Sequence, residues 1–250
     1  MVKFQDKVAL VTGGAEGIGK AVALRLGREG ASIALLDVNS EKLTTTVKEF
    51  EAAGINTKGY AADISDEEQV MNSIGQILTE FKKIDILVNA AGIVGPTSTP
   101  ITKYSSADFD RIYQVNLKGS FLMTKYTIEA MVPSGYGRIL LISSIAGKEG
   151  NPGMVGYSTT KAGITGLVKG VAKEFAGSGI TVNGLAPAVI RTAMNENTSP
   201  EQLAYMTAKI PMGRLGTVDE VAALCAFIVS EENSFTTGFI YDISGGRATY

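Results

Sequence analysis

Short apolar runs alternate with longer segments of helical periodicity from one end of the chain to the other. The runs have the length and the continuous apolar character of strands that are covered on both faces. Apolar positions at helical spacing separate them, and strands that alternate with helices predict an α/β fold with one doubly wound, Rossmann-type parallel sheet. No linker divides the chain, so we expect a single domain over residues 1–250. Strands are predicted at 8–12, 32–36, 57–62, 84–88, 139–144, 180–186 and 239–243, and the clearest helices at 20–28, 106–131 and 157–175.

The composition narrows the classes of function. The 250 residues contain no histidine and a single cysteine, Cys225, which excludes histidine-dependent nucleophilic catalysis and an intrachain disulfide. Histidine-rich zinc and iron sites are excluded for the same reason, and we expect no metal. Cys225 lies in an apolar helical pattern, where it is expected to be a buried small side chain.

Charge and hydropathy describe the expected surroundings of the protein. A formal net charge of -2 offers no basic surface to a nucleic acid. No apolar run reaches the about 20 residues that a membrane-spanning helix needs. Lys3, Asp6 and Lys7 interrupt the N-terminal region, so no signal peptide is apparent. We therefore expect a cytoplasmic protein that acts on a small-molecule substrate.

The stretch from 139 to 175 carries the strongest candidate for catalysis. Tyr157 and Lys161 are four positions apart, so a helix places them on one face about one turn apart. An ammonium near a phenol favours the phenolate, and we expect Lys161 to lower the pKa of Tyr157 toward a useful acid/base range. Ser144 ends the preceding strand and could hydrogen-bond the same reacting oxygen. Alone, a tyrosine and a lysine at this spacing are also compatible with an ordinary solvated helix face.

A glycine-rich turn follows the first predicted strand. Gly13, Gly17 and Gly19 lie between that strand and a helix, where they permit a tight turn and close approach of the backbone. The N-terminus of the helix then offers unpaired N–H groups and a positive dipole end to a pyrophosphate. The turn is therefore a candidate site for a dinucleotide.

Asp37 ends the second strand, about 20 residues beyond the glycine turn. A carboxylate there accepts hydrogen bonds from a ribose diol and repels a 2′-phosphate. Asp37 could instead cap the next helix, although Asn39 and Ser40 could cap it as well. Neither Glu16, before the second glycine, nor Val38 supplies a cation for NADP, so NAD is the expected cofactor.

Together these motifs resemble the short-chain dehydrogenase/reductase family over the whole chain. The resemblance implies the strand order 3-2-1-4-5-6-7. It also implies that Tyr157 acts as acid/base, that Lys161 holds the ribose, that Ser144 orients the substrate oxygen, and that Asn116 supports a proton path to solvent. Without the resemblance, Asn116 is an asparagine inside a predicted helix, where a specific role is plausible because its propensity is low. A homotetramer is implied, with the helices 106–131 and 157–175 pairing across a two-fold axis.

The resemblance extends to the cofactor. It implies an adenine contact at Asp63 and Ile64, although Asp63 could equally cap the next helix. The segment after the fourth strand departs from the family at Ala90, where a second asparagine is usual, and the segment after the sixth departs at Ala188, where glycine is usual. The expected cofactor residues are Gly13, Glu16, Gly17, Ile18, Gly19, Asp37, Asp63, Ile64, Asn89, Ala90, Gly92, Tyr157, Lys161, Pro187, Ile190 and Thr192.

The implied activity is hydride transfer between NAD and a secondary alcohol or ketone. A sugar or sugar acid is favoured, because Asp37 suits NAD-linked oxidation; the alternatives are a 3-oxoacyl thioester reductase and a non-catalytic dinucleotide sensor. A substrate lid is expected at about 188–212. The flexible pair Gly245 and Gly246 is expected to free the tail, so that its arginine can bind an anionic substrate. The candidate substrate residues are Lys148, Asn151, Arg191 and Arg247.

Overall fold

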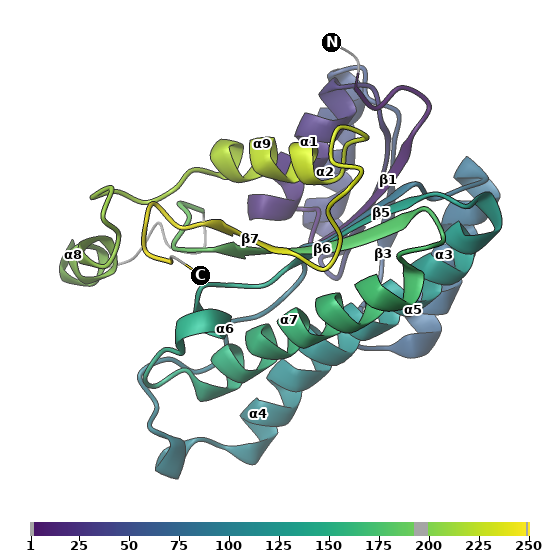
Figure 1. The fold of residues 1–250 in the computed structure, drawn as a ribbon. Helices are drawn as coiled ribbons and strands as arrows, with labels where there is room; N and C mark the ends of the chain where they lie inside the picture. The colour runs from purple at the N-terminus through teal and green to yellow at the C-terminus, as the bar shows by residue number, and fades with distance from the viewer. Residues whose placement is uncertain (1–2, 193–199, 249) are drawn as a thin grey trace.

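A parallel sheet forms the centre of the computed structural model, which describes residues 3–192, 200–248 and 250 (Figure 1). Within these residues the sheet has seven strands in the order β3-β2-β1-β4-β5-β6-β7, and every neighbouring pair is parallel. The predicted fold class and strand order are thereby confirmed. The strands are β1 (Val8–Thr12), β2 (Ser32–Asp37), β3 (Thr57–Ala61), β4 (Ile86–Asn89), β5 (Gly137–Ile142), β6 (Ile180–Pro187) and β7 (Ile240–Ile243).

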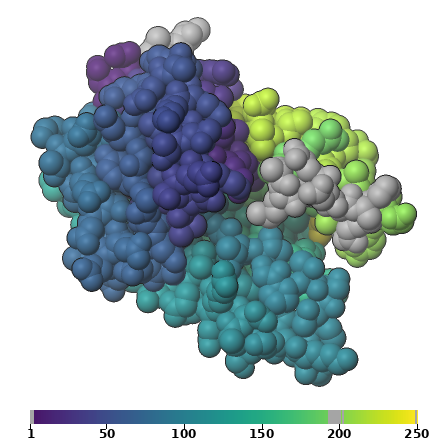
Figure 2. All heavy atoms as spheres, turned by 180° about the vertical axis from the view of Figure 1, so that it is seen from behind, coloured from purple at the N-terminus to yellow at the C-terminus, as the bar shows by residue number. Residues whose placement is uncertain are grey.

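Helices cover both faces of the sheet (Figure 1). One face carries α1 (Gly17–Arg28), α2 (Ser40–Ala52) and α9 (Val218–Ile228). The other carries α3 (Glu67–Phe81), α5 (Gly119–Met131) and α7 (Val155–Phe175). The shorter elements are η1 (Ile101–Lys103), α4 (Ser106–Ile112), η3 (Val132–Ser134), α6 (Ala146–Glu149) and α8 (Pro200–Ala208). Seen from behind, the teal segment near residue 100 forms a projection below the N-terminal half of the chain (Figure 2).

The two helical layers explain why the strands are continuously apolar. Val11 of β1 packs in the core on the α1 side, and its neighbour Leu10 packs in the core on the α7 side. Successive strand residues point to opposite faces, so a sheet covered on both faces needs apolar side chains at every position. Cys225 of α9 is fully buried in the first of these cores, as expected, and burial raises the pKa of its thiol.

The predicted helix 106–131 is not one continuous α-helix. It consists of α4, a π-helical turn η2 (Tyr113–Lys118) and α5. A π-turn interrupts the regular hydrogen-bond ladder of a helix and is often found at functional sites. Asn116 lies in this turn and is fully buried, which accounts for an asparagine at a position where an α-helix disfavours one.

The described residues contain no helix that is both long enough and apolar enough to cross a membrane.

Candidate active site

The end of β5 and the first turns of α7 bring Ser144, Tyr157 and Lys161 together. The Ser144 hydroxyl lies close enough to the Tyr157 phenol to lower its pKa, and the Lys161 Nζ lies 5.7 Å from the centre of the tyrosine ring. Lys161 donates from Nζ to the Ile142 carbonyl at 2.8 Å, and its own carbonyl accepts a hydrogen bond from the Ser143 hydroxyl at 2.7 Å. These contacts join the helix carrying Tyr157 to the strand that precedes Ser144.

Burial controls the protonation of this site. It raises the pKa of the Tyr157 phenol, and the hydrogen bond from Ser144 opposes that rise. It lowers the pKa of Lys161 to about 8, because a charged ammonium is poorly solvated in the interior. The prediction that Lys161 lowers the pKa of Tyr157 is therefore wrong for this structure, in which the cost of burying a phenolate dominates.

Asn116 and Gly92 complete this part of the site. The Asn116 Oδ1 accepts from the Ile93 N–H at 2.8 Å, and its Nδ2 donates to the Ile93 carbonyl at 2.9 Å. A Cβ atom placed on Gly92 would lie 3.2 Å from the Asn116 Oδ1 and 3.5 Å from the Lys161 Nζ. Asn116 thus fixes the segment that follows β4 directly beside the buried lysine.

The glycine turn has the close packing that a phosphate cradle requires. Gly13 has φ +61°, and a Cβ on Gly19 would lie 2.1 Å from the Gly13 carbonyl oxygen, so side chains are excluded at both positions. Glu16 occupies the N-cap position of α1 without a capping hydrogen bond from its side chain, and Ile18 lies in the first turn. An uncapped helix N-terminus directs backbone N–H groups at a pyrophosphate, so the turn fits the expected dinucleotide.

Asp37 lies beside this turn at the end of β2. Its carboxylate accepts hydrogen bonds from the Ala15 N–H at 3.1 Å and the Asn39 N–H at 3.0 Å. The helix cap of α2 is Asn39, which accepts from the Lys42 N–H, so the alternative role of Asp37 as that cap is wrong. The structure therefore places the Asp37 carboxylate against the glycine turn, and its contact with a ribose stays a prediction.

Sequence reasoning missed Lys42. Its Nζ donates to the Glu16 carboxylate at 2.6 Å, and this hydrogen bond raises the pKa of Lys42, with a smaller contribution from Asp37. A cation therefore does lie near the adenosine end of the predicted site, although Glu16 neutralises it. The sequence did contain a signal for Lys42, because this residue lies in the first turn of α2. That helix follows β2 directly, so its first turn lies beside the strand end that carries Asp37.

Asp63 and Ile64, predicted to contact the adenine, follow β3. The Asp63 carboxylate accepts from both the N–H and the hydroxyl of Ser65, whereas Asp66 caps α3. The alternative that Asp63 is the helix cap is therefore wrong. Ile64 is buried, and a Cβ placed on Gly119 would lie 2.8 Å from its side chain, so this side chain belongs to the core.

Asn89 and Ala90 lie at the end of β4, next to the glycine turn. The Thr12 hydroxyl donates to the Asn89 Oδ1 at 2.7 Å, and the Asn89 Nδ2 donates to the Ser120 hydroxyl at 2.9 Å. The same Thr12 hydroxyl accepts from the Ala91 N–H at 3.1 Å. The Asn89 side chain therefore joins β4 to β1 and α5, and it holds Thr12, the residue directly before the glycine turn.

The segment after β6 reaches the glycine turn. A Cβ on Gly17 would lie 3.9 Å from the Thr192 Cγ2, which places two distant parts of the sequence side by side. Pro187 ends β6, and Ile190 forms an isolated bridge with Gly216. The backbone at Ala188 is not in the left-handed region, so alanine replaces the usual glycine there without strain. Within the predicted lid, residues 193–199 lie outside the described residues.

Two of the four candidate substrate residues are already paired within the chain. Lys148 binds the Asp242 carboxylate at 2.8 Å, and Arg247 binds the Glu149 carboxylate at 2.7 Å. Asn151 accepts from Arg247 at 3.4 Å, whereas Arg191 is exposed. The cationic side chains of Lys148 and Arg247 are therefore not open to an anionic substrate in this structure.

The tail is not freed by its glycine pair, contrary to the prediction. Gly245 and Gly246 both have positive φ, which turns the chain back onto the segment before Met212. A Cβ on Gly245 would lie 2.6 Å from the Ile210 side chain, and the Arg247 N–H donates to the Ser244 carbonyl at 3.2 Å. The pair shapes a packed turn that brings Arg247 against α6.

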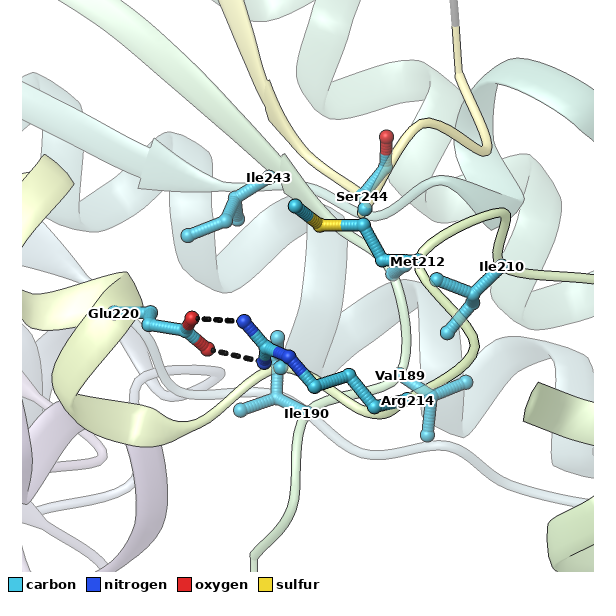
Figure 3. Close-up of a pocket in the computed structure, with 11 residues that line it drawn as sticks. Val189, Ile190, Ile210, Met212, Arg214, Glu220, Ile243 and Ser244 are labelled. Atoms are coloured by element: carbon cyan, nitrogen blue, oxygen red, sulfur yellow. Dashed lines mark hydrogen bonds and ion pairs between the residues drawn. The ribbon is translucent and has the colours of Figure 1, made fainter.

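A small cavity of about 100 Å³ lies beside the segment after β6 (Figure 3). Ile190, Met212 and Ile243 contribute to an apolar lining, and Arg214 forms a bidentate ion pair with Glu220 at its edge. Tyr157 and Lys161 do not line it. It was not predicted from the sequence, because its walls come from three separate segments.

Comparisons with known proteins agree with this geometry. A family model described as enoyl-(acyl carrier protein) reductase matches residues 13–248. The chain is 41% identical to the 2-dehydro-3-deoxy-L-rhamnonate dehydrogenase (NAD(+)) of Sphingomonas sp. (strain SKA58), over 99% of this chain and 98% of that protein. It is 36% identical to the 3-oxoacyl-(acyl-carrier-protein) reductase FabG of Thermotoga maritima, over 98% of this chain and 99% of that protein. The solved structure of NAD+-bound xylitol dehydrogenase superposes with a TM-score of 0.93 at 34% identity, over 98% of this chain and 100% of that chain. The chain belongs to the short-chain dehydrogenase/reductase family of oxidoreductases.

Proposed function

We propose that the protein is an NAD-dependent dehydrogenase that interconverts a secondary alcohol and a ketone, with a sugar or sugar acid as its substrate. The observation that carries this proposal is the grouping of Ser144, Tyr157 and the buried Lys161 where β5 ends and α7 begins. The substrate class is supported by the names of similar proteins, which are a sugar-acid dehydrogenase and a xylitol dehydrogenase.

Proton transfer is assigned to Tyr157. When bound, NAD accepts or supplies the hydride at the substrate carbon. In oxidation the Tyr157 phenolate takes the proton of the substrate hydroxyl, and in reduction the phenol returns a proton to the carbonyl oxygen. Ser144 orients that oxygen, Lys161 holds the ribose, and Asn116 supports the path of the proton to solvent. Because burial raises the pKa of Tyr157, we expect reduction to be favoured near neutral pH and oxidation to need a more alkaline medium.

The preference for NAD over NADP is assigned to Asp37. Its carboxylate is fixed by two backbone N–H groups and is available to a ribose diol, whereas it would repel a 2′-phosphate. Glu16 adds a second carboxylate to this end of the site and neutralises Lys42. The remaining cofactor contacts are assigned to the glycine turn and to the segments after β3, β4 and β6.

The wider organisation is part of the same proposal. Residues 1–250 form one catalytic domain, with a substrate lid at about 188–212. The protein is a cytoplasmic homotetramer in which α5 and α7 pair with their copies across a two-fold axis. Support comes from the family resemblance and from Phe121 of α5, a large apolar side chain that is exposed in the single chain.

A 3-oxoacyl thioester reductase is the second candidate. It is favoured by the identity to the FabG proteins of several bacteria, including those of Thermotoga maritima and Escherichia coli. The two candidates differ in substrate and cofactor, because Asp37 disfavours NADPH. A dinucleotide sensor without catalysis is less well supported, since it has no need to retain Ser144, Tyr157 and Lys161 together.

Turnover of a panel of substrates tests the proposal. The panel contains sugars, sugar acids, polyols and oxoacyl thioesters, each with NAD and NADP. NAD-linked turnover of a sugar or sugar acid, lost in Tyr157→Phe while NADH still binds by fluorescence titration, is the expected result. A phenylalanine variant with substantial kcat would refute the mechanism, and preferred NADPH-linked reduction of a thioester would establish the second candidate.

A further inference from the structure

The one-turn helix α6 is held on its outer side by the last strand and the C-terminal tail. Lys148 donates to both oxygens of the Asp242 carboxylate, at 3.0 and 2.8 Å. The next residue, Glu149, accepts two hydrogen bonds from the Arg247 guanidinium, at 2.9 and 2.7 Å. Adjacent residues of opposite charge are thus paired with two different elements. We refer to these four residues as the α6 clamp.

The α6 clamp is largely shielded from solvent. The side chain of Arg247 is 9% exposed and that of Lys148 is 11% exposed, and their carboxylate partners are 30% and 23% exposed. Partly buried charge pairs are screened less by salt than exposed pairs. Hydrogen bonds between charged groups are also short and have a defined geometry. The α6 clamp therefore fixes the position of α6, unlike ion pairs that are exposed on the surface.

The inner side of α6 is joined to the catalytic residues. The Ser144 hydroxyl accepts from the Ala146 N–H at 3.1 Å, and the Ser144 carbonyl accepts from the Gly147 N–H at 2.9 Å. A Cβ on Gly147 would lie 2.6 Å from the Lys161 carbonyl carbon, so α6 packs directly on the backbone of α7. A shift of α6 must therefore change the relation between Ser144 and the helix that carries Tyr157.

We propose that Arg247 and Lys148 are positioning residues, which hold Ser144 beside Tyr157 by fixing α6. This inference rests on the proposed function, because it assigns a supporting role in the same reaction. It replaces the expectation that these cations bind an anionic substrate, since both are neutralised by carboxylates of their own chain. The tail thus acts on catalysis through α6, without contact with the substrate.

The test compares Arg247→Met, Arg247→Lys and Lys148→Met with the parent protein, and combines Arg247→Met with Ser144→Ala in a double-mutant cycle. Arg214→Met is the control, because it removes another arginine–carboxylate pair of the C-terminal half, in which Arg214 binds Glu220 and not α6. Amide hydrogen exchange at residues 146–149 provides a readout that is independent of activity.

Arg247→Met should lower kcat roughly tenfold to hundredfold, the size of effect that a misplacement of about 1 Å produces. The affinity for NADH should stay unchanged, and amide exchange at 146–149 should become faster. The apparent pKa of the oxidative kcat profile should rise, because Ser144 lowers the pKa of Tyr157 and would lie less well placed to do so. In the Ser144→Ala background, Arg247→Met should have no further effect on kcat. As a single variant, Arg247→Lys should retain part of the kcat that Arg247→Met loses.

Any of three results would overturn the inference. The first is an unchanged kcat in Arg247→Met and Lys148→Met with faster exchange at 146–149, because α6 would then move without an effect on catalysis. The second is full additivity with Ser144→Ala, and the third is an equal loss of kcat in Arg214→Met. Failure of the proposed function is distinguishable, since Ser144→Ala and Tyr157→Phe alone would then leave turnover intact.

Discussion

Lys161 should destabilise the fold at neutral pH, and replacing it should reveal by how much. Burial lowers its pKa from the ordinary 10.5 to about 8. Each pKa unit corresponds to about 1.4 kcal/mol, so keeping this lysine charged in the folded protein costs roughly 3 kcal/mol. Lys161→Met removes that cost and also removes the hydrogen bond to the Ile142 carbonyl, which is worth about 1 kcal/mol. The variant should therefore be more stable than the parent by roughly 2 kcal/mol at pH 7, and it should be inactive.

The pH dependence has a definite sign. Between pH 8 and 10.5 the unfolded chain keeps the proton on Lys161 while the folded chain has lost it, so the stability of the parent rises with pH in this window. The advantage of Lys161→Met should be complete below pH 8 and should disappear, or reverse, by about pH 10.5.

Urea unfolding of both proteins, at one protomer concentration and without added cofactor, measures the difference at each pH. Lys20→Met is the control, because Lys20 forms only a surface pair with Glu49 and should show no such trend. A difference between parent and Lys161→Met that is constant from pH 7 to 10.5 would refute the argument, because the lysine would then titrate alike in the folded and unfolded states.

Two further predictions concern the cofactor. Asp37→Ala should narrow the preference for NAD over NADP by about tenfold, because the substitution removes both a carboxylate that repels a 2′-phosphate and an acceptor for the ribose. The ratio of kcat/KM for the two cofactors measures this preference. Equal kcat/KM values for NAD and NADP in the parent protein would contradict the assignment. Gly19→Ala should destabilise the fold by about 1–3 kcal/mol in urea and weaken NADH binding, because its Cβ would lie 2.1 Å from the Gly13 carbonyl oxygen. Gly75→Ala is its control, since a Cβ there meets no atom within 4 Å beyond the neighbouring residues and the backbone of its own helix, and alanine favours the helix. A loss of equal size in Gly75→Ala would contradict the steric argument.

The fold could be predicted because its signals are local. Each buried strand needs apolar side chains at consecutive positions, so the runs at 8–12 and 32–36 reveal strands without knowledge of their neighbours. The spacing of Gly13 and Gly19 is equally local, since both serve one turn. Tyr157 and Lys161 share a helix, and their proximity follows from its period.

Other features could not be predicted because they depend on tertiary packing. Lys148 pairs with a residue 94 positions away and Arg247 with one 98 positions away, so no window of sequence contains both partners. The pKa of Tyr157 was assigned the wrong direction for the same reason, since its neighbour in the sequence was visible and its burial was not. The π-turn at Asn116 is another case, because the side chain of that residue bonds the backbone of Ile93, which lies 23 positions earlier.

The partners of three cations near the end of β5 identify the one that is retained for function. Lys148 and Arg247 are paired with carboxylates, so their burial is compensated. Lys161 is 4% exposed and donates to a backbone carbonyl, and burial is the cause of its lowered pKa. A structural role does not explain an ammonium kept where it weakens the fold, since methionine would fill the same space. Perturbed groups of this kind concentrate at active sites, and the cost is consistent with the role proposed for Lys161, which is to hold the ribose beside the proposed acid/base Tyr157.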